Sequence, residues 1–212
     1  MVILSNPVPS FKISEDMLPA RPSRVLKPSE LDRLLKSVEG VAATRDVAII
    51  LLIATTGLPS PDIYKIRYQD FYGDHLIAGG RTIYLTNATQ VAIWTYLHEF
   101  RDPLEEFLKD KTLFVSRTLY KRLTPRGIQN ALQKHFDKAD VDGSARDLRH
   151  TAVVELLKNA RNECERSYLA GYLGYTNPSS ISHLDLPKLS EEDEPVPQLM
   201  ANSWLNNLGN HR

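Results

Sequence analysis

The stretch that decides the fold is Ser144-Ala145-Arg146-Asp147-Leu148-Arg149-His150-Thr151-Ala152-Val153-Val154-Glu155-Leu156-Leu157. Ser144 stands three residues before Asp147 and just ahead of an apolar run. This spacing predicts a helix that begins here, with a hydroxyl cap and a carboxylate on the positive end of the helix dipole. At about 100° per residue, Arg149 falls within the core-facing arc of the predicted helix. The apolar members of that arc are Leu148, Ala152, Val153, Leu156 and Ala160.

A guanidinium on a core-facing stripe needs a partner. An unpaired charge there costs several kcal/mol, so Arg149 is predicted to meet a carboxylate, a set of carbonyls or a ligand anion held near the helix N-terminus. Physical chemistry alone leaves an internal salt bridge and a bound anion both open, because buried arginines are often structural.

Several blocks of the chain match the motifs of one family. Residues 146–151 read Arg-Asp-Leu-Arg-His-Thr, which resembles the H-x-L-R-H-T box of the tyrosine recombinases, or phage integrases. Residues 45–71 resemble the family's R-D-x-A and T-G-L-R blocks, and residues 113–116, 123–128 and 173–175 resemble its shorter motifs. The resemblance covers residues 26 to 184 in the family order. It implies a mainly α fold with a small antiparallel β-sheet (α+β), in which Arg149 holds the scissile phosphate.

The chain departs from the family pattern at most catalytic positions. Pro59 follows T-G-L where the family has its first catalytic arginine, and the hairpin at residues 76–85 contains no lysine, so Arg81 is its only cation. Arg146 and Tyr175 replace the two motif histidines, and Leu184 stands where the nucleophilic tyrosine is expected.

Phosphoryl transfer of this type needs a nucleophile, a proton donor for the leaving hydroxyl and cations on the phosphate oxygens. We therefore predict a noncatalytic pseudo-recombinase, not an enzyme, that binds DNA and regulates recombination, replication or transcription. Two alternatives stay open: an active strand-cleaving recombinase with a displaced nucleophile, and a protein-interaction module that no longer binds DNA. Packing is the favoured role for Tyr168, Tyr172 and Tyr175.

The charge distribution points to a partner. The formal net charge is zero, yet residues 117–149 carry a net charge of +4. Cations crowded into a loop and helix start favour phosphate binding. The predicted partner is double-stranded DNA, and the predicted DNA-binding residues are Arg117, Lys121, Arg122, Arg126, Arg146, Arg149 and His150.

Composition excludes several other classes. The 212 residues are 42% hydrophobic and 25% charged, and no apolar run is long enough to cross a membrane. The start of the chain lacks a basic region typical of a signal peptide. Cys164 is the only cysteine and the six histidines are scattered, so we expect no metal, no cofactor and a cytoplasmic protein.

Three segments are expected along the chain. Residues 1–25 contain four prolines and are predicted to form an extended N-terminal arm, which leaves no room for the family's N-terminal core-binding domain. Residues 26–186 form the integrase-like catalytic-domain fold. Residues 187–212 form an acidic linker and an amphipathic C-terminal helix. That helix is expected either to join a second copy or a related recombinase, or to pack on its own domain.

Local signals define the expected elements. A helix begins at Pro28, a buried helix spans residues 44–56 and ends at Gly57, and Ser60 caps the next helix. Residues 68–85 are predicted to form two or three short antiparallel strands. Further helices are predicted at residues 91–100, 124–137, 162–173 and 178–183, and a short strand is predicted at 112–115. The helix at 91–100 is expected to have an apolar face that includes Val91 and Trp94.

Overall fold

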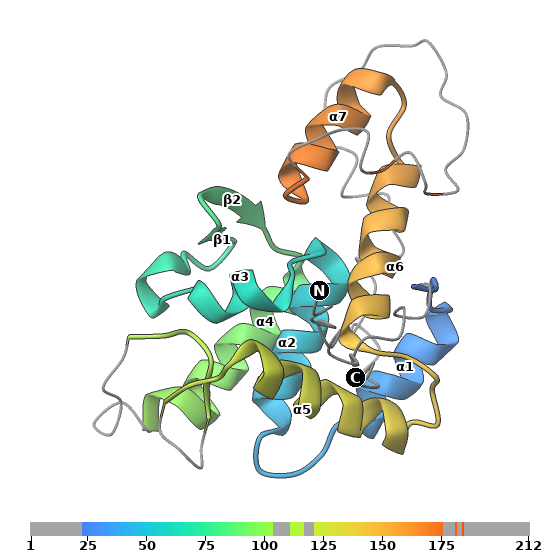
Figure 1. The fold of residues 1–212 in the computed structure, drawn as a ribbon. Helices are drawn as coiled ribbons and strands as arrows, with labels where there is room; N and C mark the ends of the chain where they lie inside the picture. The colour runs from blue at the N-terminus through green and yellow to red at the C-terminus, as the bar shows by residue number, and fades with distance from the viewer. Residues whose placement is uncertain (1–22, 104–110, 117–120, 176–180, 182–183, 185–212) are drawn as a thin grey trace, which may run out of the picture.

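Helices make up most of the computed structural model, which describes residues 23–103, 111–116, 121–175, 181 and 184 (Figure 1). The helices are α1 (Pro28–Ser37), α2 (Ala43–Thr56), α3 (Ser60–Lys65), α4 (Asn87–Tyr96), α5 (Pro125–Lys138), α6 (Ala145–Lys158) and α7 (Glu163–Tyr172). The strands form two antiparallel pairs, β1 (His75–Ala78) with β2 (Arg81–Tyr84), and β3 (Val115–Ser116) with β4 (Lys121–Arg122). The predicted mainly helical α+β fold is confirmed.

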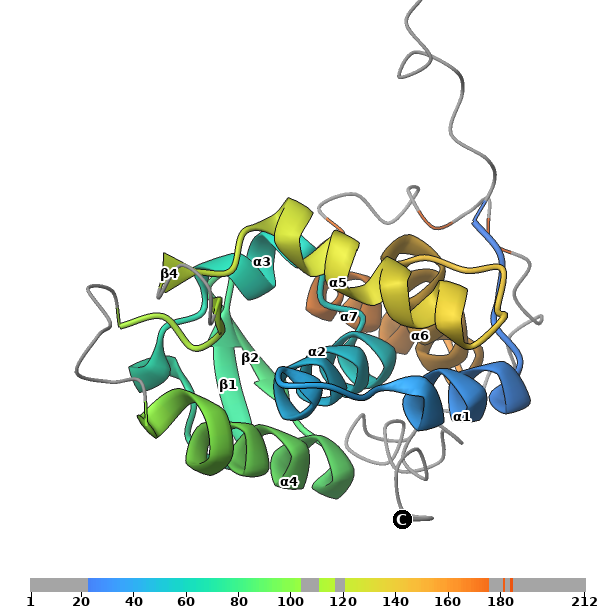
Figure 2. The same cartoon turned by 90° about the horizontal axis from the view of Figure 1, so that it is seen from below.

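The centre of the fold is α2, as its nearly continuous apolar sequence predicts. Eleven of its residues are buried, two at its start and all nine from Ala48 to Thr56, and α4 and α6 pack most closely against it. Figure 2 shows α2 among α1, α4, α5 and α6. The helix ends as predicted, with Gly57 in the left-handed conformation. This packing fixes the position of α6, the helix that carries Arg149.

The β1–β2 hairpin projects beside α3. Ala78 lies opposite Arg81, and His75 lies opposite Tyr84. Gly79 and Gly80 connect the strands with φ of +58° and +73°, the left-handed backbone that a two-residue hairpin turn requires and that glycine adopts without strain. The turn brings Arg81 to the start of β2.

Two local expectations differ from the structure. Pro59, not Ser60, is the N-cap residue of α3, and Ser60 is its first residue. In α4, Val91 is 65% exposed and Trp94 is 44% exposed, although both were expected on the apolar face. The buried face of α4 contains Thr89, Ala92, Ile93 and Tyr96, at i, i+3, i+4 and i+7. Val91 and Trp94 fall outside that series.

The C-terminal end of α6 carries a second apolar cluster. Val153, Leu156 and Leu157 of α6 pack there with Leu169 and Leu173 at α7. Leu184, at the position of the family's nucleophile, packs against the same cluster.

No helix within the described ranges is long and apolar enough to cross a membrane. The predicted acidic linker and C-terminal helix lie outside the described residues. So do most of the N-terminal arm and the predicted helix at 178–183, of which only Ile181 is described.

Candidate nucleic-acid interface

The N-terminus of α6 is capped as its sequence predicts. The Ser144 hydroxyl accepts a hydrogen bond from the Asp147 backbone N–H at 3.3 Å and donates one to the Asp147 carboxylate at 2.7 Å. Three of the predicted DNA-binding residues follow on this helix. Arg146, Arg149 and His150 are related by i, i+3 and i+4 and therefore share one side of α6.

Arg149 does not lie in the core, so the expectation from its helical arc was wrong. Its side chain is partly exposed, and its guanidinium lies 5.8 Å from the centre of the Tyr175 ring. No hydrogen bond or ion pair joins Arg149 to any residue in the described parts of the chain. Leu148 and Ala152 belong to the main core, whereas Arg149 faces the turn that follows α7. The guanidinium donors stay available to an anion.

Arg81 lies near the same turn but makes polar contacts within the fold. Its guanidinium forms an ion pair with Asp62 of α3 at 2.7 Å and donates a hydrogen bond to the Tyr172 carbonyl at 2.6 Å. Gly174 packs directly on it, because a Cβ there would stand 2.6 Å from Nη1 of Arg81. The cation of the hairpin therefore holds together the hairpin, α3 and the end of α7.

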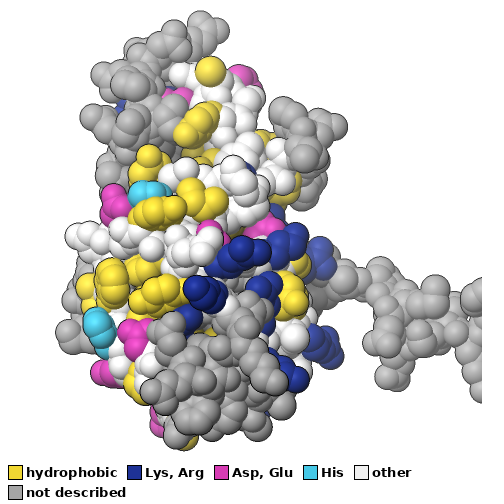
Figure 3. Space-filling model, turned by 90° about the vertical axis from the view of Figure 1, so that its left-hand side faces the viewer, with side chains coloured by type: hydrophobic (Ala, Val, Ile, Leu, Met, Phe, Trp, Pro, Cys, Tyr) yellow, Lys and Arg dark blue, Asp and Glu magenta, His cyan; other side chains and the backbone are white. Residues whose placement is uncertain are grey.

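A second group of cations lies between the end of α3 and the start of α5. Figure 3 shows Lys and Arg side chains gathered on this side of the molecule. The Arg122 guanidinium lies 4.9 Å from the centre of the Tyr64 ring, so β4 packs on α3. Arg67 pairs with Thr112 in an isolated β-bridge, so the β3 region joins them. We call this group the basic face, and its members are Lys65, Arg67, Lys111, Lys121, Arg122 and Arg126.

The structure divides the predicted DNA-binding residues into two groups. Lys121, Arg122 and Arg126 belong to the basic face, whereas Arg146, Arg149 and His150 lie on α6. Arg117 lies outside the described residues. Sequence reasoning missed Lys65, Arg67 and Lys111, which stand far from residue 121 in the chain. Their neighbouring sequence did not mark them, because acidic residues balance the charge around each of them and the contacts of α3 with β3, β4 and α5 are tertiary.

The tyrosines near Arg149 differ in their surroundings. Tyr168 is 56% exposed on α7, and Tyr172 is largely buried between α7 and the hairpin. Burial raises the pKa of the Tyr172 phenol, so its neutral form is favoured. Tyr175 is partly exposed and contacts Arg149. Within the described ranges, no three His, Cys, Asp or Glu side chains are placed to hold a metal ion.

Known proteins share this sequence and this fold. The chain is 32% identical over 201 residues to the tyrosine recombinase XerC of Caldanaerobacter subterraneus subsp. tengcongensis, covering 90% of this chain and 55% of the relative. The crystal structure of XerA recombinase matches with a TM-score of 0.65 at 21% identity, over 79% of this chain and 62% of that one. The XerH site-specific recombinase bound to its difH substrate, in a pre-cleavage complex, matches with a TM-score of 0.62 at 19% identity, over 77% and 51%. No family model matches the sequence.

A helical core with a short hairpin and an arginine-bearing α6 defines a catalytic domain of the recombinase type. The chain belongs to the tyrosine recombinase and integrase family, as its motifs predicted. It spans about half the length of the curated relative that it matches. The prediction that this chain is not an enzyme is contradicted, because the matched proteins are tyrosine recombinases, which are enzymes.

A departure from a family motif describes one position of the sequence, not the set of chemical groups that surround Arg149. The fold, however, gathers groups from several segments around the turn at residues 172–175. Arg81 arrives there from the hairpin, and Tyr175 contacts Arg149. A replaced motif residue therefore does not define which groups surround Arg149.

Proposed function

We propose that this chain binds double-stranded DNA through its phosphates during DNA recombination. The observation that carries the proposal is Arg149, a partly exposed guanidinium at the N-terminal part of α6 with no ion pair to the described residues. A helix N-terminus and an unpaired guanidinium both favour a phosphate group. Recombinases that share the fold include XerH, whose structure contains its difH substrate.

The basic face supplies the additional contacts in this proposal. Lys121 and Arg126 are exposed, and Lys65 and Lys111 extend the positive surface toward α3. Such contacts to the backbone position a duplex without reading its sequence. The zero net charge of the chain is compatible with this role, because local charge density sets the contact with phosphates.

The salt dependence of duplex binding tests the proposal. Binding of a labelled mixed-sequence duplex, followed by fluorescence anisotropy, is expected to weaken steeply as salt rises, with a log–log slope of about −0.9 per phosphate contact. Arg149→Ala and Lys121→Glu should both weaken binding and flatten the slope by about 1. The matched control is Lys36→Glu, an equal charge reversal on α1, at the far end of the molecule from β4 in Figure 2. Equal losses for Lys36→Glu and Lys121→Glu would reject the assignment of this face.

A second candidate function is DNA strand cleavage by Tyr175. It is favoured by the contact between the Tyr175 ring and Arg149, the residue proposed to hold a phosphate. In this reaction the phenol oxygen bonds to phosphorus, the bond from phosphorus to the bridging sugar oxygen breaks, and the phenolic proton passes to the leaving oxygen. Arg149 stabilises the charge that develops on the non-bridging oxygens.

A nicked suicide duplex tests this second candidate. The expected result is a covalent protein–DNA adduct that survives denaturing electrophoresis, is lost in Tyr175→Phe and persists in Tyr168→Phe. Tyr168 is the matched control because it is an exposed tyrosine on the same helix–turn segment. An adduct that persists in Tyr175→Phe excludes Tyr175 as the nucleophile, and the absence of any adduct leaves duplex binding as the function that the structure supports.

A further inference from the structure

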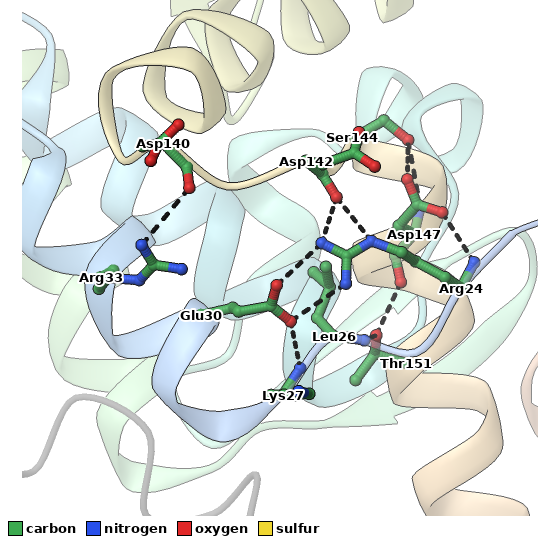
Figure 4. A network of polar contacts seen from close by, with 10 residues as sticks. All are labelled: Arg24, Leu26, Lys27, Glu30, Arg33, Asp140, Asp142, Ser144, Asp147 and Thr151. Carbon is green, nitrogen blue, oxygen red and sulfur yellow. Dashed lines mark hydrogen bonds and ion pairs between the residues drawn. The ribbon is translucent and has the colours of Figure 1, made fainter.

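Residues 23–27 lie along the first turns of α6, and we call this segment the strap (Figure 4). The Arg24 backbone N–H donates a hydrogen bond to Oδ1 of Asp147 at 2.9 Å. The Leu26 backbone N–H donates one to Oγ1 of Thr151 at 2.8 Å. Leu26, Asp147 and Thr151 are each at most 1% exposed. The bond from Leu26 is therefore made in the interior, where an unpaired donor costs about 1–3 kcal/mol, and the bond from Arg24 is partly buried.

The strap is fastened on its other side to α1 and to the α5–α6 loop. The Arg24 guanidinium forms two hydrogen bonds with the Glu30 carboxylate, at 3.0 and 3.1 Å. Its Nε donates to the Asp142 carbonyl at 2.6 Å. Glu30 also accepts the Lys27 backbone N–H at 2.8 Å, which holds the start of α1. A bidentate arginine–carboxylate pair has a defined geometry, so the strap has one preferred path.

The strap contacts α6 on the side opposite Arg149. Asp147 and Thr151 are four residues apart and share one side of the helix. Arg149 lies two residues from each, a rotation of about 200° around the helix axis. A small rotation of α6 would move Arg149 and would break both hydrogen bonds to the strap.

We propose that Asp147 and Thr151 are positioning residues, through which the strap fixes the orientation of α6 and thereby directs Arg149 toward a DNA phosphate. This proposal rests on the proposed function of Arg149 in DNA binding. In this proposal the strap makes no contact of its own with the DNA. Its effect on DNA binding passes through Arg149.

The test removes one buried acceptor and measures duplex binding. Thr151→Val keeps the volume of the side chain but leaves the Leu26 N–H without its acceptor, whereas Thr151→Ser retains the hydroxyl. Fluorescence anisotropy at constant salt should show binding weakened by roughly fivefold to tenfold in Thr151→Val and by less than about twofold in Thr151→Ser. Thermal unfolding of both variants identifies the temperature range in which they are folded.

A double-mutant cycle separates positioning from general destabilisation. In an Arg149→Ala background, Thr151→Val is expected to cause no further loss of binding, because the residue that it positions is absent. An equal further loss would overturn the proposal, and so would unchanged binding of Thr151→Val in the wild-type background. Arg24→Ala should act like Thr151→Val. Arg33→Ala is the control, since Arg33 is exposed and its one polar contact within the described residues is with the Asp140 carbonyl at 3.4 Å.

Hydrogen exchange separates failure of this proposal from failure of the proposed function. If the wild-type chain does not bind duplex DNA in a salt-dependent manner that requires Arg149, the proposed function is wrong and the positioning role falls with it. The rate of hydrogen exchange at the amides of residues 145–151, measured without DNA, shows how firmly the strap holds α6. Faster exchange is expected in Thr151→Val and Arg24→Ala but not in Arg33→Ala. Unchanged exchange in both would show that the strap does not hold α6.

Discussion

Arg81 and Arg149 lie near the same turn of the chain, but their surroundings are opposite. Arg81 lies between the hairpin, α3 and α7, and its guanidinium is paired with Asp62 and bonded to the Tyr172 carbonyl. Arg149 contacts a single aromatic ring and has no ion pair in the described structure. The comparison shows that one guanidinium stabilises the domain and the other is available to a ligand.

The largest expected effect in this comparison is the loss of the Arg81 contacts. Arg81→Ala leaves the Asp62 carboxylate, which is 20% exposed, without its cation and leaves the Tyr172 carbonyl without a donor. We expect the free energy of unfolding to fall by about 2–3 kcal/mol. Urea unfolding measures this change, and a loss below about 0.5 kcal/mol would show that the enclosed arginine contributes little.

The next effect concerns the packing of Gly174 on Arg81. Gly174 has a φ of +88°, and an added Cβ would stand 2.6 Å from the guanidinium. Gly174→Ala is therefore expected to destabilise the protein by about 1–2 kcal/mol in urea unfolding. Gly171→Ala is the matched control. Nothing lies within 4 Å of a Cβ at that helical position, so it should stabilise α7 by up to about 1 kcal/mol.

Arg149→Ala should have a much smaller effect on stability. Its guanidinium forms no hydrogen bond within the described residues, so removal should change the free energy of unfolding by about 0.5 kcal/mol or less. Urea unfolding in parallel with Arg81→Ala measures the difference between the two arginines. Equal losses in the two variants would mean that Arg149 is structural as well, and the comparison would fail.

Local signals in the sequence predicted most of the fold. The Ser144 cap and the end of α2 at Gly57 both depend on neighbouring residues, and both were confirmed. The family motifs added the order in which these elements pack. These signals act over a few residues, so a single sequence contains them.

The site was less predictable because its properties depend on tertiary contacts. A helical arc gives the direction of Arg149 but not the depth of the core at that point, so its burial was predicted wrongly. Lys65 and Lys111 join the basic face only through contacts between α3 and the β3 region. Counting motif departures likewise gave the wrong expectation that the chain is not an enzyme, because it treated each position separately.

An effect comparable in size to that of Arg149→Ala is the pH dependence of the strap, on the Arg149 side of the comparison. The hydrogen bond from Arg24 lowers the pKa of the Glu30 carboxyl, against a smaller opposing effect of desolvation. The stabilisation is therefore present above the pKa of Glu30 in the unfolded chain, about 4.3, and is lost as the pH falls through the lower pKa of the folded state. We expect it to amount to less than about 1 kcal/mol, because the pair lies near the surface.

Comparison with Glu30→Gln isolates this titration. The free energy of unfolding of the wild type should exceed that of Glu30→Gln at neutral pH. The gap should narrow as the pH falls below the pKa of Glu30 in the unfolded chain, and it should close only below the lower pKa of the folded state, where Glu30 is protonated in both states. Urea unfolding across this range measures the gap. In an Arg24→Ala background the pH-dependent part of the gap should shrink, since the group that lowers the pKa is gone. A gap that stays constant with pH would show that the ion pair does not fasten the strap, and that the hydrogen bonds of Asp147 and Thr151 hold it alone.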